Sequence, residues 1–250
     1  MKPKPARFVL LFATWLLAGT VCGDAVADTC AGKFDIDAAE LDWSEEQEFR
    51  ERFAAAAETV CKWWGPSWTH GFEIVVDRRR GPSMALVPAW RGSRGSMIFR
   101  APTIRRSASA IVHEVTHVLA PNANRFLAEG LAVYAQEALG GQPAYPGFGH
   151  DLHRLAARLD RSADIAALER YATPTRLRSE ALDGREAYIV AGSFVRYLIE
   201  TYGMERFRKL YALTPLVPRS RDPGDPARWR TVYGKPLAAL AEGWRLALER

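Results

Sequence analysis

The sequence lacks the features that would point to nucleic acid or to a repeated architecture. It contains no internal repeat, no low-complexity tract, and no basic helix with interleaved aromatic side chains. Its arginines are dispersed, and the only run, Arg78–Arg80, precedes Gly81-Pro82 and reads as a solvated turn. The formal net charge is only +5 over 250 residues. We therefore expect no nucleic-acid partner.

Long apolar runs are also lacking, apart from one near the N-terminus. The stretch Phe8–Val21 follows three basic residues and precedes the small-residue segment Ala25–Ala27. A membrane span needs about 20 apolar residues, so this run favours a cleaved signal peptide over an uncleaved anchor. The sequence thus predicts that residues 1–27 are removed and that residues 28–250 are secreted or periplasmic, with no membrane association after cleavage.

Cysteine is scarce, with three residues in the whole chain. Cys22 would be lost with the signal peptide, and Thr20-Val21 before it lacks the small residue that a lipoprotein site requires. Cys30 and Cys61 remain. In an exported protein such a pair predicts a disulfide bond, and two free buried thiols are the alternative.

Histidine is scarce too, but two of the five histidines form the pentapeptide His113-Glu114-Val115-Thr116-His117. Two histidines four residues apart lie on one face of a helix, so both imidazoles can reach the same ion. Glu114 follows the first histidine and can polarise a water molecule on that ion without binding it. This arrangement is typical of a zinc hydrolase.

The residues that flank the motif argue against a polar helix face that carries two histidines by chance. Ala110–Val112 and Val118–Ala120 are apolar, so the helix is expected to be mostly buried. A buried helix with two histidines and a glutamate needs partners for all three side chains. A metal ion with its water would supply them.

A catalytic zinc usually takes three protein ligands, so a third is expected downstream. His117 is followed by Val-Leu-Ala-Pro-Asn-Ala-Asn-Arg, without the further histidine of the metzincin pattern. Pro121-Asn122 breaks the helix, and Asn124 is a candidate N-cap for the next one. Glu129 stands alone among small and apolar residues of that second helix, where an unpaired carboxylate would be costly. It is the candidate third ligand.

The His113–His117 motif followed by the segment Glu129–Tyr134 (E-G-L-A-V-Y) resembles the gluzincin metallopeptidases, especially the short peptidase MA-like families. The resemblance implies one zinc ion held by His113, His117 and Glu129, with Glu114 as general base. It also implies a zincin-like (thermolysin-like) catalytic core, and it extends more weakly over roughly residues 70 to 248.

Four further positions bear on this site. Tyr188 matches a recurring tyrosine of the helix that follows the glutamate ligand, where it would stabilise the oxyanion; a core tyrosine with a local acceptor is the alternative. Some relatives carry an acidic residue four positions after the glutamate ligand, which could orient a histidine, but here that residue is Val133. His150 and His153 flank a glycine-rich loop and are interpreted as surface residues rather than as part of the cleft.

The expected elements give an α+β fold, with a small N-terminal β-sheet followed by a mainly helical half. Besides the two helices of the site, we expect a helix at 43–62, strands at 72–77, 84–90 and 96–101, one or two short helices near 151–169, and helices at 185–202, 204–213 and 236–249. Residues 28–250 would form one metallopeptidase domain, with a helix and sheet part at about 35–105 and a helical catalytic part at about 106–250. In the gluzincin-like folds that the sequence resembles, the strand just before the metal helix lies at the sheet edge and pairs with an extended peptide, and Ser96–Ala101 occupies that position.

The sequence therefore predicts a secreted or periplasmic zinc metallopeptidase that acts on a peptide or protein substrate. Zinc would activate a water molecule, and Glu114 would take its proton. Two alternatives remain open. The first is a catalytically silent, zinc-stabilised binding module, against which the intact Glu114 argues because a structural site needs no base. The second is a zinc amidohydrolase that acts on an amide other than a peptide.

Overall fold

The computed structural model describes residues 33–65, 71–86, 94–140, 142–159, 164–171, 177, 182–214 and 224–249. The predicted signal peptide and Cys30 lie outside these residues, so the disulfide bond remains a prediction. Its other half, Cys61, is buried near the end of the first helix. None of the helices in the described ranges is long and apolar enough to cross a membrane.

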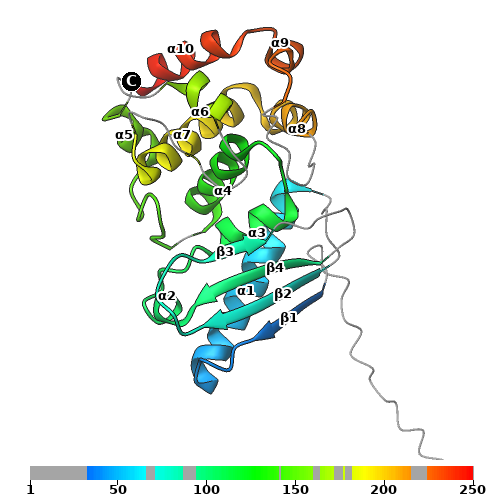
Figure 1. Cartoon of the computed structure of the whole chain (residues 1–250), viewed down its shortest axis with the longest axis vertical. Helices are drawn as coiled ribbons and strands as arrows, with labels where there is room; N and C mark the ends of the chain where they lie inside the picture. Colours follow the sequence, from blue (N-terminus) through cyan, green and yellow to red (C-terminus); the bar gives the residue numbers. More distant parts are fainter. Residues whose placement is uncertain are drawn as a thin grey trace, which may run out of the picture.

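A four-stranded sheet forms the lower part of the molecule in Figure 1. Its strands are β1 (Lys33–Asp37), β2 (Gly71–Asp77), β3 (Met84–Leu86) and β4 (Gly95–Arg100), in the spatial order β1-β2-β4-β3. The strands β1, β2 and β4 run parallel, whereas β3 pairs with β4 in the antiparallel direction.

The prediction that the strand at 96–101 forms the sheet edge was wrong. This strand is β4, and it is paired on both sides, with β2 on one and β3 on the other. The short segment β3 folds back antiparallel on β4 and takes the edge position itself. Strand order depends on such pairings between separate segments, which the residues of β4 alone do not encode.

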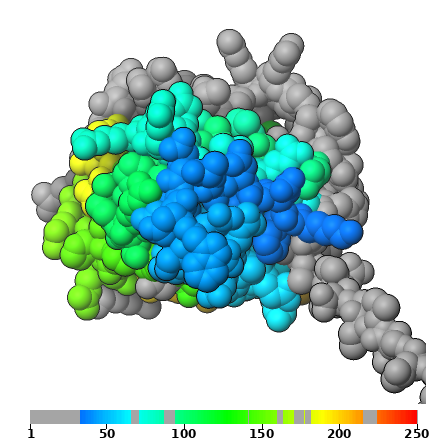
Figure 2. All heavy atoms as spheres, turned by 90° about the horizontal axis from the view of Figure 1, so that it is seen from below, coloured from blue at the N-terminus to red at the C-terminus, as the bar shows by residue number. Residues whose placement is uncertain are grey.

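Helix α1 (Trp43–Trp64) covers one face of the sheet. Along β2 buried residues alternate with exposed ones, so only one face of the sheet is packed. The rings of Phe49 and Phe53 on α1 lie 5.3 Å and 6.2 Å from the ring of Phe99 on β4. Seen from below, the blue residues of β1 and α1 occupy the middle of this end of the molecule (Figure 2).

The rest of the described chain is mainly helical; α2 (Ala101–Arg105) lies beside the sheet at one end of its strands, and the later helices lie above the sheet (Figure 1). The helices are α2 (Ala101–Arg105), α3 (Ile111–Leu119), α4 (Arg125–Leu139), α5 (Leu152–Ala157), α6 (Ile165–Tyr171), α7 (Gly184–Tyr202), α8 (Met204–Ala212), α9 (Ala227–Tyr233) and α10 (Leu237–Leu248). The chain is thus α+β, with a small N-terminal sheet and a mainly helical remainder, as the sequence predicts.

Glycines allow the two helices of the candidate site to pack closely on their neighbours. Gly95 on β4 faces Val118 of α3 so closely that a Cβ atom there would overlap the valine side chain. On α4, a Cβ atom at Gly130 would stand 2.6 Å from the backbone oxygen of Ala191 and 2.5 Å from Val195 Cγ2, both on α7. Because α4 lies directly against α7, Glu129 is held at a fixed depth between α3 and α7.

Candidate metal centre

Helix α3 presents the first two candidate ligands. All of its residues from Ile111 to Leu119 are buried, which agrees with the apolar flanks of the motif. The four-residue spacing brings the two imidazoles together, so that Nε2 of His113 lies 3.1 Å from Nε2 of His117. Two N–H groups cannot point at each other at this distance. In neutral imidazoles, at least one of the two Nε2 atoms therefore carries a lone pair that faces the space between the rings.

Helix α4 brings the third candidate ligand to this point. The helix begins after Pro121-Asn122, and Asn124 caps it, because its Oδ1 accepts a hydrogen bond from Leu127 N at 3.1 Å. One turn later Glu129 is fully buried. Its Oε2 lies 3.2 Å from Nε2 of His113 and 3.2 Å from Nε2 of His117.

The three ligand atoms form a nearly equilateral triangle with sides of 3.1, 3.2 and 3.2 Å. In a tetrahedral zinc site with bonds near 2.0–2.2 Å, two ligand atoms stand roughly 3.3 Å apart. The set of two imidazole nitrogens and one carboxylate oxygen is also a donor set that zinc takes in catalytic sites. His113, His117 and Glu129 therefore fit a zinc ion, and among the described residues they form the one such group of three.

Charge in the cluster is arranged to keep Glu129 ionised. Burial opposes ionisation, but the charge of His117, hydrogen bonds from His113 and His117, and the charge of Arg125 hold the pKa of Glu129 well below its ordinary value. Burial alone would lower the pKa of His113, but its hydrogen bond to Glu129 and the charge of that carboxylate raise it. Glu129 is thus ionised beside the two histidines, and a carboxylate must be deprotonated to bind a metal.

Glu114 lies on the same helix as the two histidines and lines the cavity onto which they open. Its side chain is buried, and this burial raises the pKa of its carboxyl above the ordinary value. It is adjacent to the cluster, but it is not one of the three converging groups. This placement suits a group that accepts a proton beside the metal rather than one that binds it.

Tyr188 enters the site from α7. Its ring is stacked on that of His113, with centroids 6.5 Å apart and planes inclined by 15°. Burial raises the pKa of its phenol to about 12, so the hydroxyl keeps its proton at neutral pH and remains a donor. Tyr188 lines the same cavity as Glu114 and Glu129, and it is partly buried.

Arg125 is a site residue that sequence reasoning missed. It lies four residues before Glu129 on α4, and its Nη2 contacts Oε1 of Glu129, the oxygen that faces away from the two histidines. The same nitrogen donates to the Tyr188 hydroxyl at 3.4 Å. The sequence signal was present, since arginine and glutamate four apart on a helix lie side by side.

The cluster lies at a cavity of about 920 Å³. One wall comes from the edge strand β3, the other from the segment between α4 and α5, with Tyr145 and Phe148. Eight large hydrophobic residues in the described part of the chain are exposed, and four of them line this one cavity: Met84, Leu86, Tyr145 and Phe148. The space beside the three candidate ligands is therefore open and has an apolar rim.

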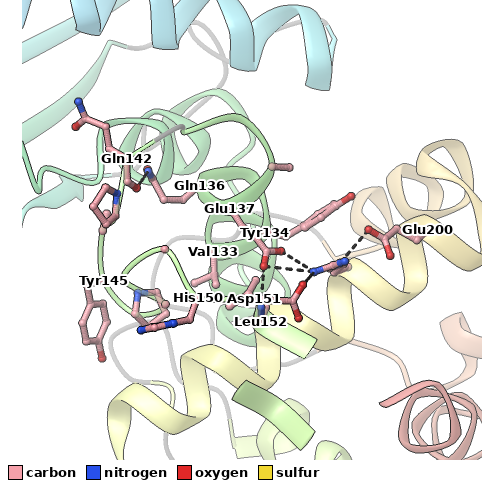
Figure 3. Close-up of a pocket in the computed structure, with 17 residues that line it drawn as sticks. Val133, Tyr134, Gln136, Glu137, Gln142, Tyr145, His150, Asp151, Leu152 and Glu200 are labelled. Carbon is pink, nitrogen blue, oxygen red and sulfur yellow. Dashed lines mark hydrogen bonds and ion pairs between the residues drawn. The ribbon is translucent and has the colours of Figure 1, made fainter. Parts of the chain in front are cut away.

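His150 and His153 do not join the cluster. His150 is exposed and lines a second cavity of about 570 Å³, shown in Figure 3, while His153 Nδ1 lies 2.8 Å from the buried Ser193 hydroxyl. In that second cavity Arg196 pairs with three carboxylates, those of Glu137, Asp151 and Glu200. Arg196 thus contacts all three carboxylates and offsets part of their negative charge.

Val133, which replaces the acidic residue of some relatives, faces α7 instead of the metal cluster. A Cβ atom at Gly192 of α7 would overlap its side chain, so this position serves helix packing. Near the first histidine the structure offers a different contact, in which the backbone nitrogen of His113 donates to Gln136 Oε1 at 3.2 Å.

No protein-family model and no curated protein matches this chain. Among solved structures it is similar to a crystal structure of a variant M1 zinc metallopeptidase from Deinococcus radiodurans, with a TM-score of 0.43 and 14% sequence identity. The match covers 86% of this chain and 47% of the other, so the chain spans about half the length of that protein. The function proposed below rests on the residues of the cavity and not on this likeness.

Proposed function

We propose that this chain is a zinc-dependent metallopeptidase with a gluzincin-type site in a zincin-like core. His113, His117 and Glu129 hold one zinc ion, and Glu114 is the general base. The observation that carries the proposal is the triangle of two imidazole nitrogens and one carboxylate oxygen, 3.1–3.2 Å on a side, at an open cavity that Glu114 also lines.

Zinc in such a site supplies Lewis acidity, which lowers the pKa of a coordinated water and polarises a carbonyl group. Glu114 takes the proton that the water loses as it attacks the scissile carbonyl carbon. It then passes that proton to the nitrogen of the leaving amine as the C–N bond breaks. Burial raises the pKa of Glu114 above its ordinary value, which makes its carboxylate a stronger base than an exposed one.

Tyr188 donates a hydrogen bond to the oxyanion that develops on the carbonyl oxygen. Its hydroxyl is protonated, its ring is packed against His113, and it lines the cavity. A donor that is already in place costs no reorganisation at the moment of reaction.

The substrate that fits this cavity is an extended peptide with apolar side chains. No described strand pairs with β3 on its outer side, so its backbone can add a peptide as a further strand. Met84 and Leu86 from β3 and Tyr145 and Phe148 from the opposite wall offer apolar contacts to the side chains of that peptide. Main-chain pairing supplies affinity, and the rim supplies the preference for apolar residues.

We also propose that the enzyme acts outside the cytoplasm, as one domain of residues 28–250 released from its signal peptide. The basic start, the short apolar run and the small residues before Asp28 support this.

The proposal is tested by incubating the purified protein with a degenerate peptide library and reading the cleavage sites by mass spectrometry. We expect one zinc per chain, cleavage that a chelator abolishes and added zinc restores, and apolar residues beside the cut bond. A protein that holds one zinc but cleaves no peptide would point to the silent binding module, and cleavage of non-peptide amides alone would point to the amidohydrolase.

A further inference from the structure

The carboxylate of Glu129 has two different environments, one for each oxygen. Oε2 faces the two imidazoles at 3.2 Å from each Nε2. Oε1 faces the guanidinium of Arg125, whose Nη2 is in direct contact with it. Since both oxygens of a free carboxylate are equivalent, an arginine on one of them decides which oxygen turns towards the metal and in which plane the group lies.

Arg125 also reaches a third helix, α7. Its Nη2 lies 3.4 Å from the Tyr188 hydroxyl on α7, and the arginine lines the same cavity as the cluster. Its side chain is 26% exposed against 1% for Glu129, so most of the arginine side chain is removed from water beside a fully buried carboxylate. In such surroundings a charge pair is weakly screened and orients its members strongly.

A substrate anchor is the other use to which an arginine in a cleft can be put. A peptide carboxylate would compete for the nitrogen that already contacts Glu129 and Tyr188. The geometry favours the internal role, because Nη2 of Arg125 already contacts Oε1 of the buried Glu129 and lies 3.4 Å from the Tyr188 hydroxyl. Without Arg125, Oε1 of the buried Glu129 carboxylate would lose its counter-charge.

We propose that Arg125 is a positioning residue of the metal centre: it holds Oε1 of Glu129, so that Oε2 alone faces the metal, and it keeps the Tyr188 hydroxyl on the same side of the cavity. This inference rests on the proposed zinc site, but it concerns metal binding and can be tested without any substrate. In some relatives an acidic residue at the position of Val133 could orient a histidine ligand. In this chain a basic residue, Arg125, would orient the glutamate ligand instead.

The test compares zinc affinity, by competition with a chromophoric chelator, and the visible absorption of the Co²⁺-substituted protein for wild type, Arg125→Gln and Arg125→Lys. We expect Arg125→Gln to weaken zinc binding by about tenfold to a hundredfold and to change the Co²⁺ spectrum, because the carboxylate is free to turn. Arg125→Lys keeps the charge but lacks the planar guanidinium group, so its zinc affinity should lie between those of wild type and Arg125→Gln.

Arg196→Gln is the matched control. Arg196 also precedes its glutamate partner, Glu200, by four residues on a helix, but the pair lies at the second cavity. The Arg196→Gln substitution should leave zinc affinity and the Co²⁺ spectrum unchanged, even if it lowers the melting temperature. Melting temperatures of the zinc-free proteins show whether each variant is folded, and Arg125→Lys keeps the test valid where Arg125→Gln fails to fold.

Arg125→Gln with wild-type zinc affinity and an unchanged Co²⁺ spectrum would overturn the inference and leave the zinc site standing. The same result with a raised KM for peptides would make Arg125 a substrate anchor and would also overturn it. Wild-type protein that binds no zinc would instead overturn the proposed function.

Discussion

Nη2 of Arg125 on α4 lies 3.4 Å from the hydroxyl of Tyr188 on α7, while the same nitrogen contacts Glu129. One guanidinium thus links a candidate metal ligand to the candidate oxyanion donor. The link depends on the close approach of α4 to α7, which Gly130 and Gly192 permit. Helix packing, metal binding and the arrangement of the catalytic groups are therefore coupled at this contact.

Loss of the carboxylate ligand should weaken metal binding steeply. Glu129→Ala turns a site of three protein ligands into one of two, and we expect zinc affinity to fall by far more than for Arg125→Gln. Zinc titration against a competing chelator measures this. Full zinc affinity in Glu129→Ala would place the third ligand elsewhere and would remove the gluzincin assignment.

Removal of the Tyr188 hydroxyl should affect turnover more than substrate binding. Tyr188→Phe keeps the ring that stacks on His113, so the fold and the zinc content should not change. The oxyanion exists only beyond the ground state, so kcat should fall while KM changes little. A fall confined to KM in steady-state kinetics would instead assign Tyr188 to ground-state substrate binding.

A methyl group between α4 and α7 should disturb both stability and the site. Gly130→Ala places its Cβ 2.6 Å from the backbone oxygen of Ala191, which cannot move without shifting α7. We expect the free energy of unfolding to fall by roughly 1–3 kcal/mol, as for other overpacked cores, and zinc affinity to fall with it. Gly184→Ala, which has open space around it at the start of α7, is the control, and its denaturation midpoint should stay level or rise. Equal midpoints for Gly130→Ala and wild type would contradict the packing account.

Processing at the N-terminus can be read directly by mass spectrometry. We expect the exported protein to begin at Asp28 and, without reduction, to yield a peptide pair joined through Cys30 and Cys61. An intact N-terminus would mean an uncleaved anchor or no export. Free thiols on both cysteines would remove the disulfide bond from the account.

Local sequence patterns predicted much of the fold and the three converging side chains. His113 and His117 share a helix face because of their spacing, and the break at Pro121-Asn122 with the cap at Asn124 set the start of α4 correctly. What the patterns could not supply depends on contacts between separate elements. The edge position of β3 depends on its pairing with β4, and the contact of Arg125 with Tyr188 joins α4 to α7.

The elements missed by the sequence analysis are short. Strand β1 and helix α2 have five residues each, and α9 has seven, too few for a periodic pattern to emerge. Their positions are set by pairing and packing. β1, for example, exists as a strand because it is hydrogen-bonded alongside β2 over its whole length.

The most direct test of the central claim compares wild type with Glu114→Gln on the same peptide substrates, with zinc measured in both. The amide is nearly isosteric with the carboxylate and lies outside the group of converging ligands, so zinc content and melting temperature should match those of wild type. The amide cannot accept the proton, so kcat/KM should fall by at least about a hundredfold. Unchanged hydrolysis by a zinc-loaded Glu114→Gln protein would contradict the account, because the activity would then arise without the proposed base.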